Sequence, residues 1–577
     1  MRASVLGVVA STFVLGLTAV VACGSGRDGF DEDANDAGTD GGGSSGSLPF
    51  DGGFGNDDAG DPDLPPGETR DPVDCEEAKT SKSYVGCDYW PTVTPNPVWS
   101  IFDYAVVVAN TGTKDADVTV TGPNAVNKQV TVPAGQLRKI FLPWVPTLKG
   151  ADFDECTSSP ELNNSVIASE GAYHLVSSTP VIVYQFNALQ YKGEGGEGPD
   201  GGAKDWSTCP GTTVACAGIF GSSFVGCSSF SNDASLLLPS TAMTNNYRVT
   251  GYKGASGKPL IGAERGIIAA VLSVTATQPG TEVTVTLSST AKVVASVSGQ
   301  EVKATAGGGK ITLTLDKAGD VAQFVSDKGK QFDFSGSLVQ TNKPVQVIAS
   351  NPCISIPSDK AACDHIEETV LPAETLGKHY IVTHPTGPKG QPVGHNVRLY
   401  GNQDGTTLTY APSKPAKCPD TLNAGQVADC EVVSETFDVT GDKEFGVSTF
   451  LLGATVYSDP KGDPSQTNVA AVEQFRTKYV FLAPKDYPVR RADITATEDA
   501  EIEIDGAPVS APWTKIGNGP FGVHRVDLTK SGQDGAHTLT AKKPVGVQVV
   551  GFGDNTSFQY PAGLNLNIIA PPPPPPK

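Results

Sequence analysis

The sequence predicts an all-β protein made of tandem β-sandwich-like units, stapled by disulfides and preceded by a disordered linker. Three observations carry this prediction. Gly and Pro make up 65 and 44 of the 577 residues, well above ordinary usage, so the chain is rich in turns. Many short stretches alternate apolar and polar residues, as half-buried antiparallel strands do. The region that contains these stretches also holds ten cysteines, which is typical of disulfide-bonded exported proteins.

The N-terminus has the pattern of an export signal. Arg2 precedes an apolar run from Val5 to Ala22, which ends at Cys23. A small residue directly before a cysteine at this place resembles a bacterial lipoprotein signal, in which the cysteine thiol receives diacylglycerol. We therefore expect residues 1–22 to be a signal peptide and the lipid on Cys23 to hold the protein in a membrane. This predicts an exported protein at the outer membrane or cell surface of a Gram-negative bacterium; an ordinary cleaved signal or an uncleaved anchor is the alternative.

Both ends of the mature chain are predicted to lie outside the folded region. Positions 24–74 hold 14 acidic residues against two Arg and are otherwise rich in Gly, Ser and Pro. Such a segment cannot bury enough apolar surface to fold, so we expect residues 23–74 to be a lipidated, disordered, self-repelling linker. Residues 566–577 contain six consecutive prolines and predict a stiff polyproline II tail.

The cysteine count agrees with lipidation. The chain has 11 Cys, and setting Cys23 aside leaves ten, enough for five disulfides. Three pairs would close short loops: Cys75/Cys87, Cys353/Cys363 and Cys418/Cys430. The pairing of Cys156, Cys209, Cys216 and Cys227 stays open. None of the spacings is that of a zinc finger, so disulfides are favoured over zinc.

Three sequence elements recur in the same order along the chain. An apolar stretch with aromatic residues comes first, at 237–249, 371–382 and 479–483. A turn followed by an alternating strand comes next, at 115–119, 280–284, 404–408 and 498–502. A polar residue followed by Pro, Val and apolar residues closes the set at 178–184, 342–348 and 542–549, with a degenerate copy at 443–450. A repeated order of elements indicates internal repeats.

We therefore predict four diverged β units at 84–230, 231–366, 367–465 and 466–565. Pro opens the final strand of three units, a position that proline tolerates. Units of roughly 100–140 residues fit sandwiches better than propeller blades of about 40–50. Whether the units stand as separate sandwiches or in a propeller-like arrangement stays open.

Charge and motifs exclude several functions. The formal net charge is -21, whereas nucleic-acid binding needs a surplus of Lys and Arg, so no nucleic-acid partner is expected. The sequence contains no metalloprotease helix motif, no Gly-x-Ser-x-Gly elbow, no phosphate-binding loop and no dinucleotide fingerprint. We therefore predict no catalytic residue, no cofactor and no enzyme activity.

Two groups of residues are weaker candidates for a site. His365 and Glu367 would share one face of a strand and are the best pair for a divalent cation. A polar turn stapled by Cys353 and Cys363 is the favoured explanation of these residues, so we predict no metal. Five aromatic residues would make a carbohydrate platform if they were exposed, or core if they were buried. They are Tyr89, Trp90, Trp99, Trp144 and Trp206.

Several segments resemble the N-terminal domain of the IgG Fc-binding protein family. They are 84–90, 102–110, 183–187, His365-Ile366-Glu367-Glu368 with Leu371-Pro372, and Gly462-Asp463-Pro464-Ser465 with Glu473-Gln474-Phe475. The resemblance would cover about 84–565. Asp463, Pro464 and Ser465 match a family motif of unknown role, which has Met where this chain has Gln466. The resemblance implies a secreted, β-rich binding or matrix role, and it transfers no reaction and no Fc binding to this chain.

The sequence thus predicts a surface lipoprotein that acts as a non-enzymatic binding or adhesion module for an extracellular protein or glycan. A structural component of the envelope or extracellular matrix is the first alternative. A secreted hydrolase acting on glycans or peptides is the second.

Overall fold

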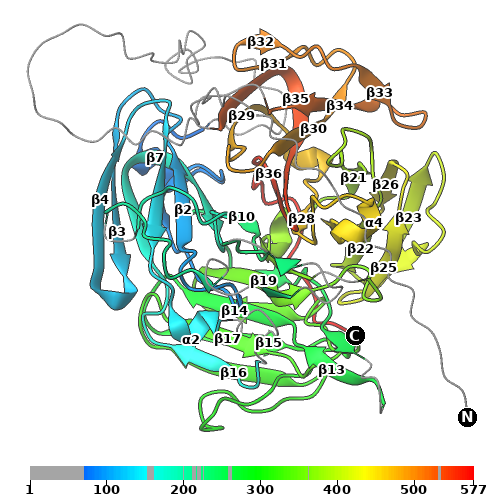
Figure 1. The fold of residues 1–577 in the computed structure, drawn as a ribbon. Coiled ribbons are helices and arrows are strands. Elements are labelled where there is room, and N and C mark those ends of the chain that lie inside the picture. Colours follow the sequence, from blue (N-terminus) through cyan, green and yellow to red (C-terminus); the bar gives the residue numbers. More distant parts are fainter. Residues whose placement is uncertain are drawn as a thin grey trace, which may run out of the picture. The chain divides into compact units, whose positions relative to one another are not determined.

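The computed structural model describes residues 71–577 except 153–161, 199–200, 211–215, 218–222, 225–226, 258–262, 361–362 and 530–534. Nearly all of its regular structure is antiparallel β-sheet, which confirms the predicted fold class (Figure 1). The helices are α1 (Cys75–Ala78), α2 (Pro146–Lys149) and α4 (Ala454–Tyr457), and the 3₁₀ turns are η1 (Pro123–Ala125), η2 (Ala373–Thr375) and η3 (Val472–Gln474). Over the described ranges, no helix is both long and apolar enough to cross a membrane. The predicted signal peptide, Cys23, Cys156 and most of the linker lie outside the described residues.

The described strands form four sandwiches, each of two antiparallel sheets, which we call the outer and the inner sheet. In the first sandwich the outer sheet has the order β4 (Val126–Val132), β3 (Ala116–Gly122), β7 (His174–Phe186), β1 (Gly86–Tyr89). The inner sheet has the order β5 (Leu137–Leu142), β2 (Tyr104–Ala109), β7, β10 (Ala234–Leu236). The long strand β7 therefore belongs to both sheets.

The second and third sandwiches repeat this strand order. The second has the outer order β16 (Lys310–Leu315), β15 (Thr281–Thr286), β18 (Leu338–Thr341), β11 (Asn246–Arg248), and the inner order β17 (Val321–Val325), β14 (Val271–Ala276), β19 (Val345–Ile354), β20 (Asp364–Thr369). The third has the outer order β24 (Thr421–Leu422), β23 (Thr406–Ala411), β26 (Phe437–Gly441), β21 (His379–Val382), and the inner order β25 (Val427–Val433), β22 (His395–Gly401), β27 (Phe445–Phe450), β28 (Gln466–Asn468). A segment of the first sandwich, β6 (Val166–Ala168), extends the inner sheet of the second by pairing with β17.

The fourth sandwich keeps the same order with one added strand. Its outer sheet runs β32 (Ala507–Pro508), β31 (Ile502–Ile504), β35 (Ala536–Gly553), β29 (Arg476–Leu482). Its inner sheet runs β33 (Trp513–Lys515), β34 (Phe521–Asp527), β30 (Val489–Thr497), β35, β36 (Thr556–Pro561). Two further pairs of short strands belong to no sheet of the four sandwiches. They are β8 (Cys216–Ala217) with β9 (Ser223–Phe224) and β12 (Ala255–Gly257) with β13 (Arg265–Ile268).

The recurring Pro-Val element marks the point where the chain passes from the outer sheet to the inner sheet. Pro180 lies inside β7, Pro344 lies between β18 and β19, and Pro544 lies inside β35. Proline cannot donate to a β-ladder, so it is tolerated where pairing changes from one sheet to the other. The last strand of each inner sheet comes after this element. In the first three sandwiches that strand, β10, β20 or β28, ends a few residues beyond the predicted unit boundary, whereas β36 ends within the range 466–565.

Burial explains why only some strands alternate in sequence. The outer strand β3 alternates buried and exposed residues, because one of its faces meets water. The inner strand β2 is buried at every position. Its Val106 and Val108 face the core of their own sandwich, whereas Ala105 and Val107 pack into the hydrophobic cluster of the fourth sandwich. An inner strand such as β2 therefore lacks the alternation of an outer strand.

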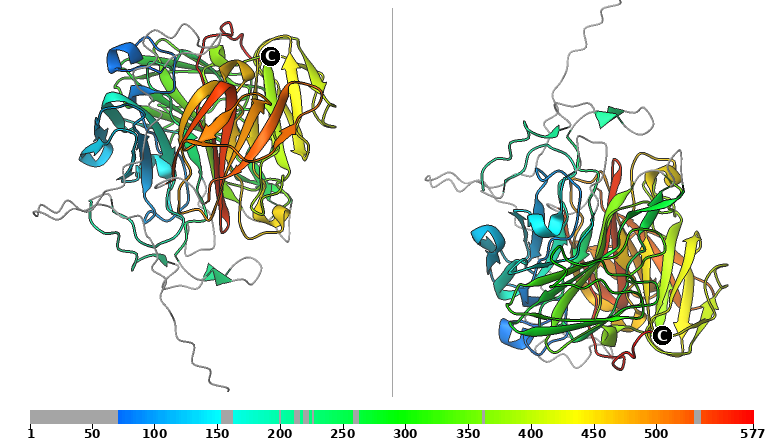
Figure 2. Two further views of the ribbon diagram at one scale, coloured as in Figure 1. Left: turned by 90° about the horizontal axis from the view of Figure 1, so that it is seen from above. Right: turned by 90° about the horizontal axis from the view of Figure 1, so that it is seen from below.

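Four axial strands, β10, β20, β28 and β36, hold the sandwiches around a common centre. Each is an edge strand of its inner sheet, and they contact one another in the cyclic order β10, β20, β28, β36, β10 (Figure 1). Figure 2 shows that each sandwich keeps one contiguous range of colours, so the sandwiches follow one another along the chain. The four sandwiches are thus arranged cyclically, one after another.

A buried tyrosine repeats in every sandwich, on the strand that opens it. Its hydroxyl donates to the backbone carbonyl of the residue where the chain enters the inner sheet. The pairs are Tyr89 with Val181, Tyr247 with Val345, Tyr380 with Phe445 and Tyr479 with Val545. In the last three sandwiches the same hydroxyl accepts the backbone N–H three residues earlier, each at 3.0 Å: Thr244, Gly377 and Arg476. These equivalent contacts support the internal repeat that the sequence pattern indicates.

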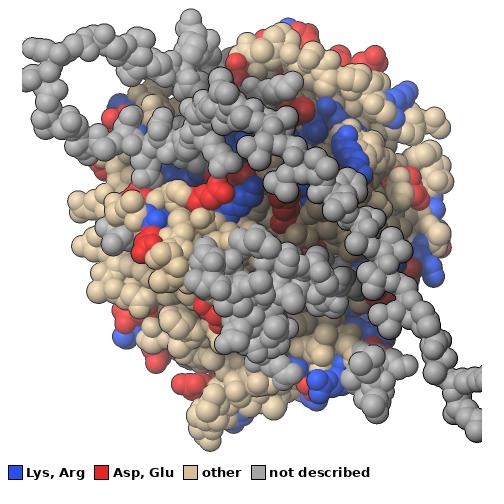
Figure 3. Space-filling model, in the orientation of Figure 1, with Lys and Arg blue, Asp and Glu red and all other residues tan. Residues whose placement is uncertain are grey.

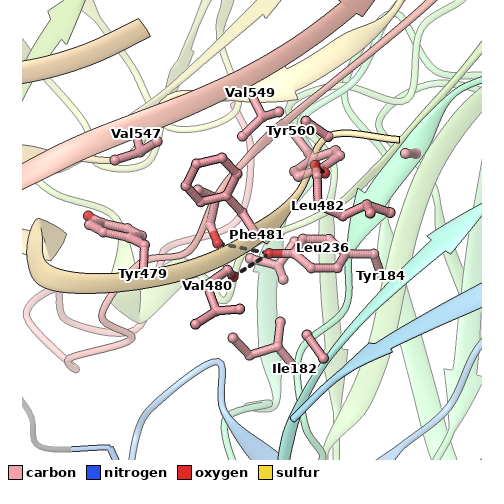
Figure 4. Packing of buried hydrophobic residues seen from close by; sticks show 14 of the residues in the cluster. Ile182, Tyr184, Leu236, Tyr479, Val480, Phe481, Leu482, Val547, Val549 and Tyr560 are labelled. Carbon is pink, nitrogen blue, oxygen red and sulfur yellow. Dashed lines mark hydrogen bonds between the residues drawn. The ribbon is translucent and has the colours of Figure 1, made fainter. Parts of the chain in front are cut away.

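The first and last sandwiches meet and close the cycle. The hydroxyl of Tyr184 on β7 lies 3.1 Å from the carbonyl oxygen of Val480 and 3.0 Å from that of Ala562 (Figure 4). Around it, residues of β2 and β7 share one hydrophobic cluster with residues of β29, β30 and β35. The first and last sandwiches are thereby joined through a large apolar contact.

Four disulfides are present among the described residues, and all close local loops. Three are the pairs expected from sequence, Cys75–Cys87, Cys353–Cys363 and Cys418–Cys430, and the fourth is Cys209–Cys227. The disulfides thus brace loops within sandwiches, and none of these four joins one sandwich to another. The proline tail packs on the second and third sandwiches, where Arg248 donates to the carbonyl of Pro574 and Lys577 pairs with Asp404.

Candidate functional site

The candidate residues from the sequence lie on the axial strands and are buried. His365 and Glu367 belong to β20, and both are 0% exposed. Asp463, Pro464 and Ser465 lie directly before β28, and Asp463 and Ser465 are also buried. The structure therefore brings the two candidate groups to one central region and removes both from the surface.

Glu367 is used as a hydrogen-bond acceptor for the first sandwich. Its carboxylate accepts from the Thr94 hydroxyl at 2.8 Å and from the side-chain amides of Gln185 and Asn187. The Nε2 atom of His365 lies 3.7 Å from the same carboxylate. Among the described residues, no group of three or more His, Cys, Asp or Glu side chains is arranged to hold a metal ion. The weak metal candidate is thus explained by contacts between sandwiches.

Other buried carboxylates join the axial strands where no β-ladder does. The Oδ2 atom of Asp233 accepts the backbone N–H groups of Glu367 and Gln466, each at 3.0 Å. The Oδ1 atom of Asp364 accepts the N–H of Asn232 at 2.9 Å. An edge strand leaves unpaired backbone groups, and here carboxylates satisfy some of them. The sequence patterns did not predict that carboxylates would join these strands. The signal that could have shown it is an acidic residue directly before a strand that is buried throughout, as Asp233 is before β10.

Burial changes the protonation of this region. Burial raises the pKa of Asp233, Asp364, Glu368 and Asp463 well above the ordinary carboxyl value. The neighbouring Asp463 and Asp233 raise the pKa of Asp364 further. A pair of acids such as Asp364 and Asp463 is able to share a proton, but neither residue lines the cleft described next. These buried carboxyl groups therefore affect the stability of the fold.

An accessible cleft lies at the boundary between the first and second sandwiches. Its volume is about 830 Å³, within the range of roughly 300–1,000 Å³ that is typical of ligand sites. The β3–β4 hairpin, α2 and the segment from β6 to β7 supply most of the lining, and Ala318 and Gly319 from the β16–β17 turn complete it. Boundaries between structural units are common places for ligand sites.

Trp90 and His174 form one wall of this cleft. Their rings stack with centroids 4.1 Å apart and planes 10° apart. Asp88 fixes both rings: it accepts from the indole N–H of Trp90 at 3.1 Å and lies 2.6 Å from Nε2 of His174. Burial opposes ionisation of Asp88, but its hydrogen bonds, first of all with His174, hold its pKa below the ordinary value. The wall is therefore held rigidly by an ionised carboxylate.

The aromatic residues that the sequence offered as a platform are mostly core. Tyr89, Trp99 and Trp144 are buried without lining the cleft, because they pack inside the first sandwich. Trp206 is partly buried against the same cluster, and Trp90 is 6% exposed at the cleft wall. An exposed five-residue platform is therefore wrong, and Trp90 alone keeps a place at an accessible site.

Comparisons with known proteins agree with part of the predicted resemblance. A family model described as "IgGFc binding protein" matches residues 233–551, more than half of the chain. It starts just before β10, the last strand of the first sandwich, so segments 84–90, 102–110 and 183–187 lie outside the match. The human protein named IgGFc-binding protein is 24% identical over 290 residues, which is 47% of this chain and 5% of that protein. A solved tetra-tandem repeat from the extending region of a large adhesion protein has 12% identity and a TM-score of 0.08 over 83% of this chain and 99% of that one, so it supports no structural argument.

Proposed function

Since the chain belongs to the IgGFc-binding protein family, we propose that it is an extracellular, non-enzymatic binding module for a protein or glycan. The family and the disulfides indicate an extracellular protein. One contrast carries the proposal of binding without catalysis. The acidic and histidine candidates from the sequence are buried as contacts between sandwiches. The accessible cleft offers hydroxyl, amide and aromatic groups, and its Glu170 and His174 are paired with Lys317 and Asp88.

The surface supports recognition by neutral contacts. On the face drawn in Figure 3, Lys and Arg side chains lie beside Asp and Glu side chains, and most of the remaining described surface is uncharged. Among the described residues, exposed charges form pairs, for example Lys292 with Asp327 and Lys317 with Glu170.

A lipid on Cys23 is the finer part of the proposal. It would hold the module at the outer membrane, and the acidic segment 24–74 would space it from the bilayer with a reach of roughly 40 Å. Mass spectrometry of the native N-terminus should show a diacylglyceryl cysteine. The variant Cys23→Ser should be released from membranes, and a membrane-bound Cys23→Ser protein would contradict lipid anchoring.

The binding function is tested with residues 71–577 produced under oxidising conditions. This range keeps Asp71, which pairs with Arg476 at 2.6 Å. Surface plasmon resonance would measure binding to mucins, defined glycans, antibody Fc and purified envelope components. Saturable binding that is lost on disulfide reduction supports the proposal. Folded protein that binds none of these, or that turns over a glycan or peptide, contradicts it.

A further inference from the structure

The acidic and basic side chains of the cleft already have partners within the chain. Glu170 pairs with Lys317 at 2.5 Å, and His174 pairs with Asp88 at 2.6 Å. They are the only acidic or basic residues among those that line the cleft. An ionic ligand would have to compete with these partners, so the lining favours an uncharged ligand.

Hydroxyl groups are the free polar groups of the cleft. Thr121, Thr147 and Ser169 line it and are exposed, and their side chains take part in no hydrogen bond within the described chain. They come from the end of β3, from α2 and from the residue after β6, so they approach the cleft from three segments. Asn124 adds an amide whose Nδ2 atom donates to the Trp144 carbonyl at 3.3 Å, which leaves its Oδ1 atom as an acceptor.

The backbone around the cleft is held in uncommon conformations. Asn124, Ala125 and Glu170 line the cleft with φ of 59°, 58° and 49°. They are three of the nine non-glycine residues with positive φ among the described positions. The left-handed region is unfavourable for an alanine, and such backbone strain gathers at ligand-binding sites. The cleft is therefore a built feature of the fold.

We propose that this cleft binds a short uncharged saccharide. Sugars present several hydroxyls, which suit Thr121, Thr147, Ser169 and Asn124, and they have apolar C–H faces that pack on aromatic walls such as Trp90 with His174. The volume of about 830 Å³ admits a ligand larger than one ring. This inference rests on the proposed binding function and names the ligand class of one site.

The test uses residues 71–577 and isothermal calorimetry with cellotriose, chitotriose, mannotriose and N-acetyllactosamine, plus sialylated N-acetyllactosamine as the acidic probe. The cleft variant carries Thr121→Ala, Thr147→Ala and Ser169→Ala. The matched control carries Thr312→Ala, Thr314→Ala and Thr409→Ala, three exposed strand threonines outside the cleft. At least one neutral saccharide should bind, and the cleft variant should lose tenfold or more in affinity while the control stays unchanged.

Three results would overturn the inference. They are no binding of any saccharide, equal binding by the cleft variant, and binding of the sialylated probe alone. Far-UV circular dichroism and the urea midpoint check that each variant is folded. If no saccharide binds the parent chain but a mucin, Fc or envelope partner does so in the resonance assay, the saccharide site fails and the binding function stands. If neither a saccharide nor a partner binds the parent chain, both fail.

Discussion

The repeated tyrosine hydroxyl allows a stability test with an internal control. In the third sandwich, the Tyr380 hydroxyl donates to the Phe445 carbonyl at 2.5 Å and accepts the Gly377 N–H at 3.0 Å. Tyr380→Phe keeps the ring and leaves both backbone groups without this partner. A buried group left unsatisfied costs about 1–3 kcal/mol, so we expect a loss of about 2–4 kcal/mol in the free energy of unfolding.

Tyr487 is the matched control. It is 0% exposed, and its hydroxyl has no hydrogen-bond partner among the described residues. Tyr487→Phe removes the same atom but relieves an unpaired polar group, so stability should stay level or rise by about 1 kcal/mol. Urea denaturation of the oxidised chain, read as the change in midpoint at constant slope, measures both variants. Equal shifts in one direction, or a Tyr380→Phe change within about 0.5 kcal/mol of zero, would refute the reasoning.

Three further predictions concern other parts of the fold. Burial raises the pKa of Asp463 above its value near 4 in the unfolded chain, so folding favours the protonated carboxyl. This contribution to the free energy of unfolding is complete below the unfolded pKa. It is lost as the pH rises through the folded pKa, at up to about 1.4 kcal/mol per pH unit. Asp463→Asn should therefore gain stability relative to the parent between pH 5 and 8, and parallel urea midpoints over that range would contradict this. Ala125→Gly should stabilise by about 0.5 kcal/mol, because glycine removes left-handed strain at φ 58° but has greater unfolded entropy; a lower urea midpoint would count against it. Replacing Cys353 and Cys363 by Ser should cost about 2–3 kcal/mol by the same assay, since their 10-residue separation closes a short loop, and no change would show that the loop is ordered without the bond.

The fold was largely predictable because its signals are local. The alternation of apolar and polar residues identified outer strands such as β15 and β16, which have one solvent-exposed face. The Pro-Val element was interpreted as the start of the final strand of three units, but in the structure it lies at the change from the outer to the inner sheet and one more strand follows it. The repeated order of elements indicated the repeats, because each element is a local pattern.

The site was not predictable because its contacts are distant in sequence. Asp233 accepts the N–H of Glu367, 134 residues away, and no local pattern encodes that bond. The cleft gathers Trp90, Thr147 and Gly319 from separate segments. Aromatic residues suggested a surface platform, but Tyr89, Trp99 and Trp144 pack into the core of the first sandwich.

The closure between the first and last sandwiches has a consequence for how the chain acquires its structure. Tyr184 and Ala562 are 378 residues apart, and much of the hydrophobic cluster that covers the apolar face of β2 and β7 comes from strands of the C-terminal quarter. A chain that emerges N-terminus first must therefore keep this face exposed until synthesis and translocation are almost complete. Contacts of such high sequence separation make folding slow, and an uncovered apolar sheet is prone to aggregate. The protein should depend on a holding chaperone in the compartment where it folds, and truncation before β29 should yield insoluble material in place of three independent sandwiches.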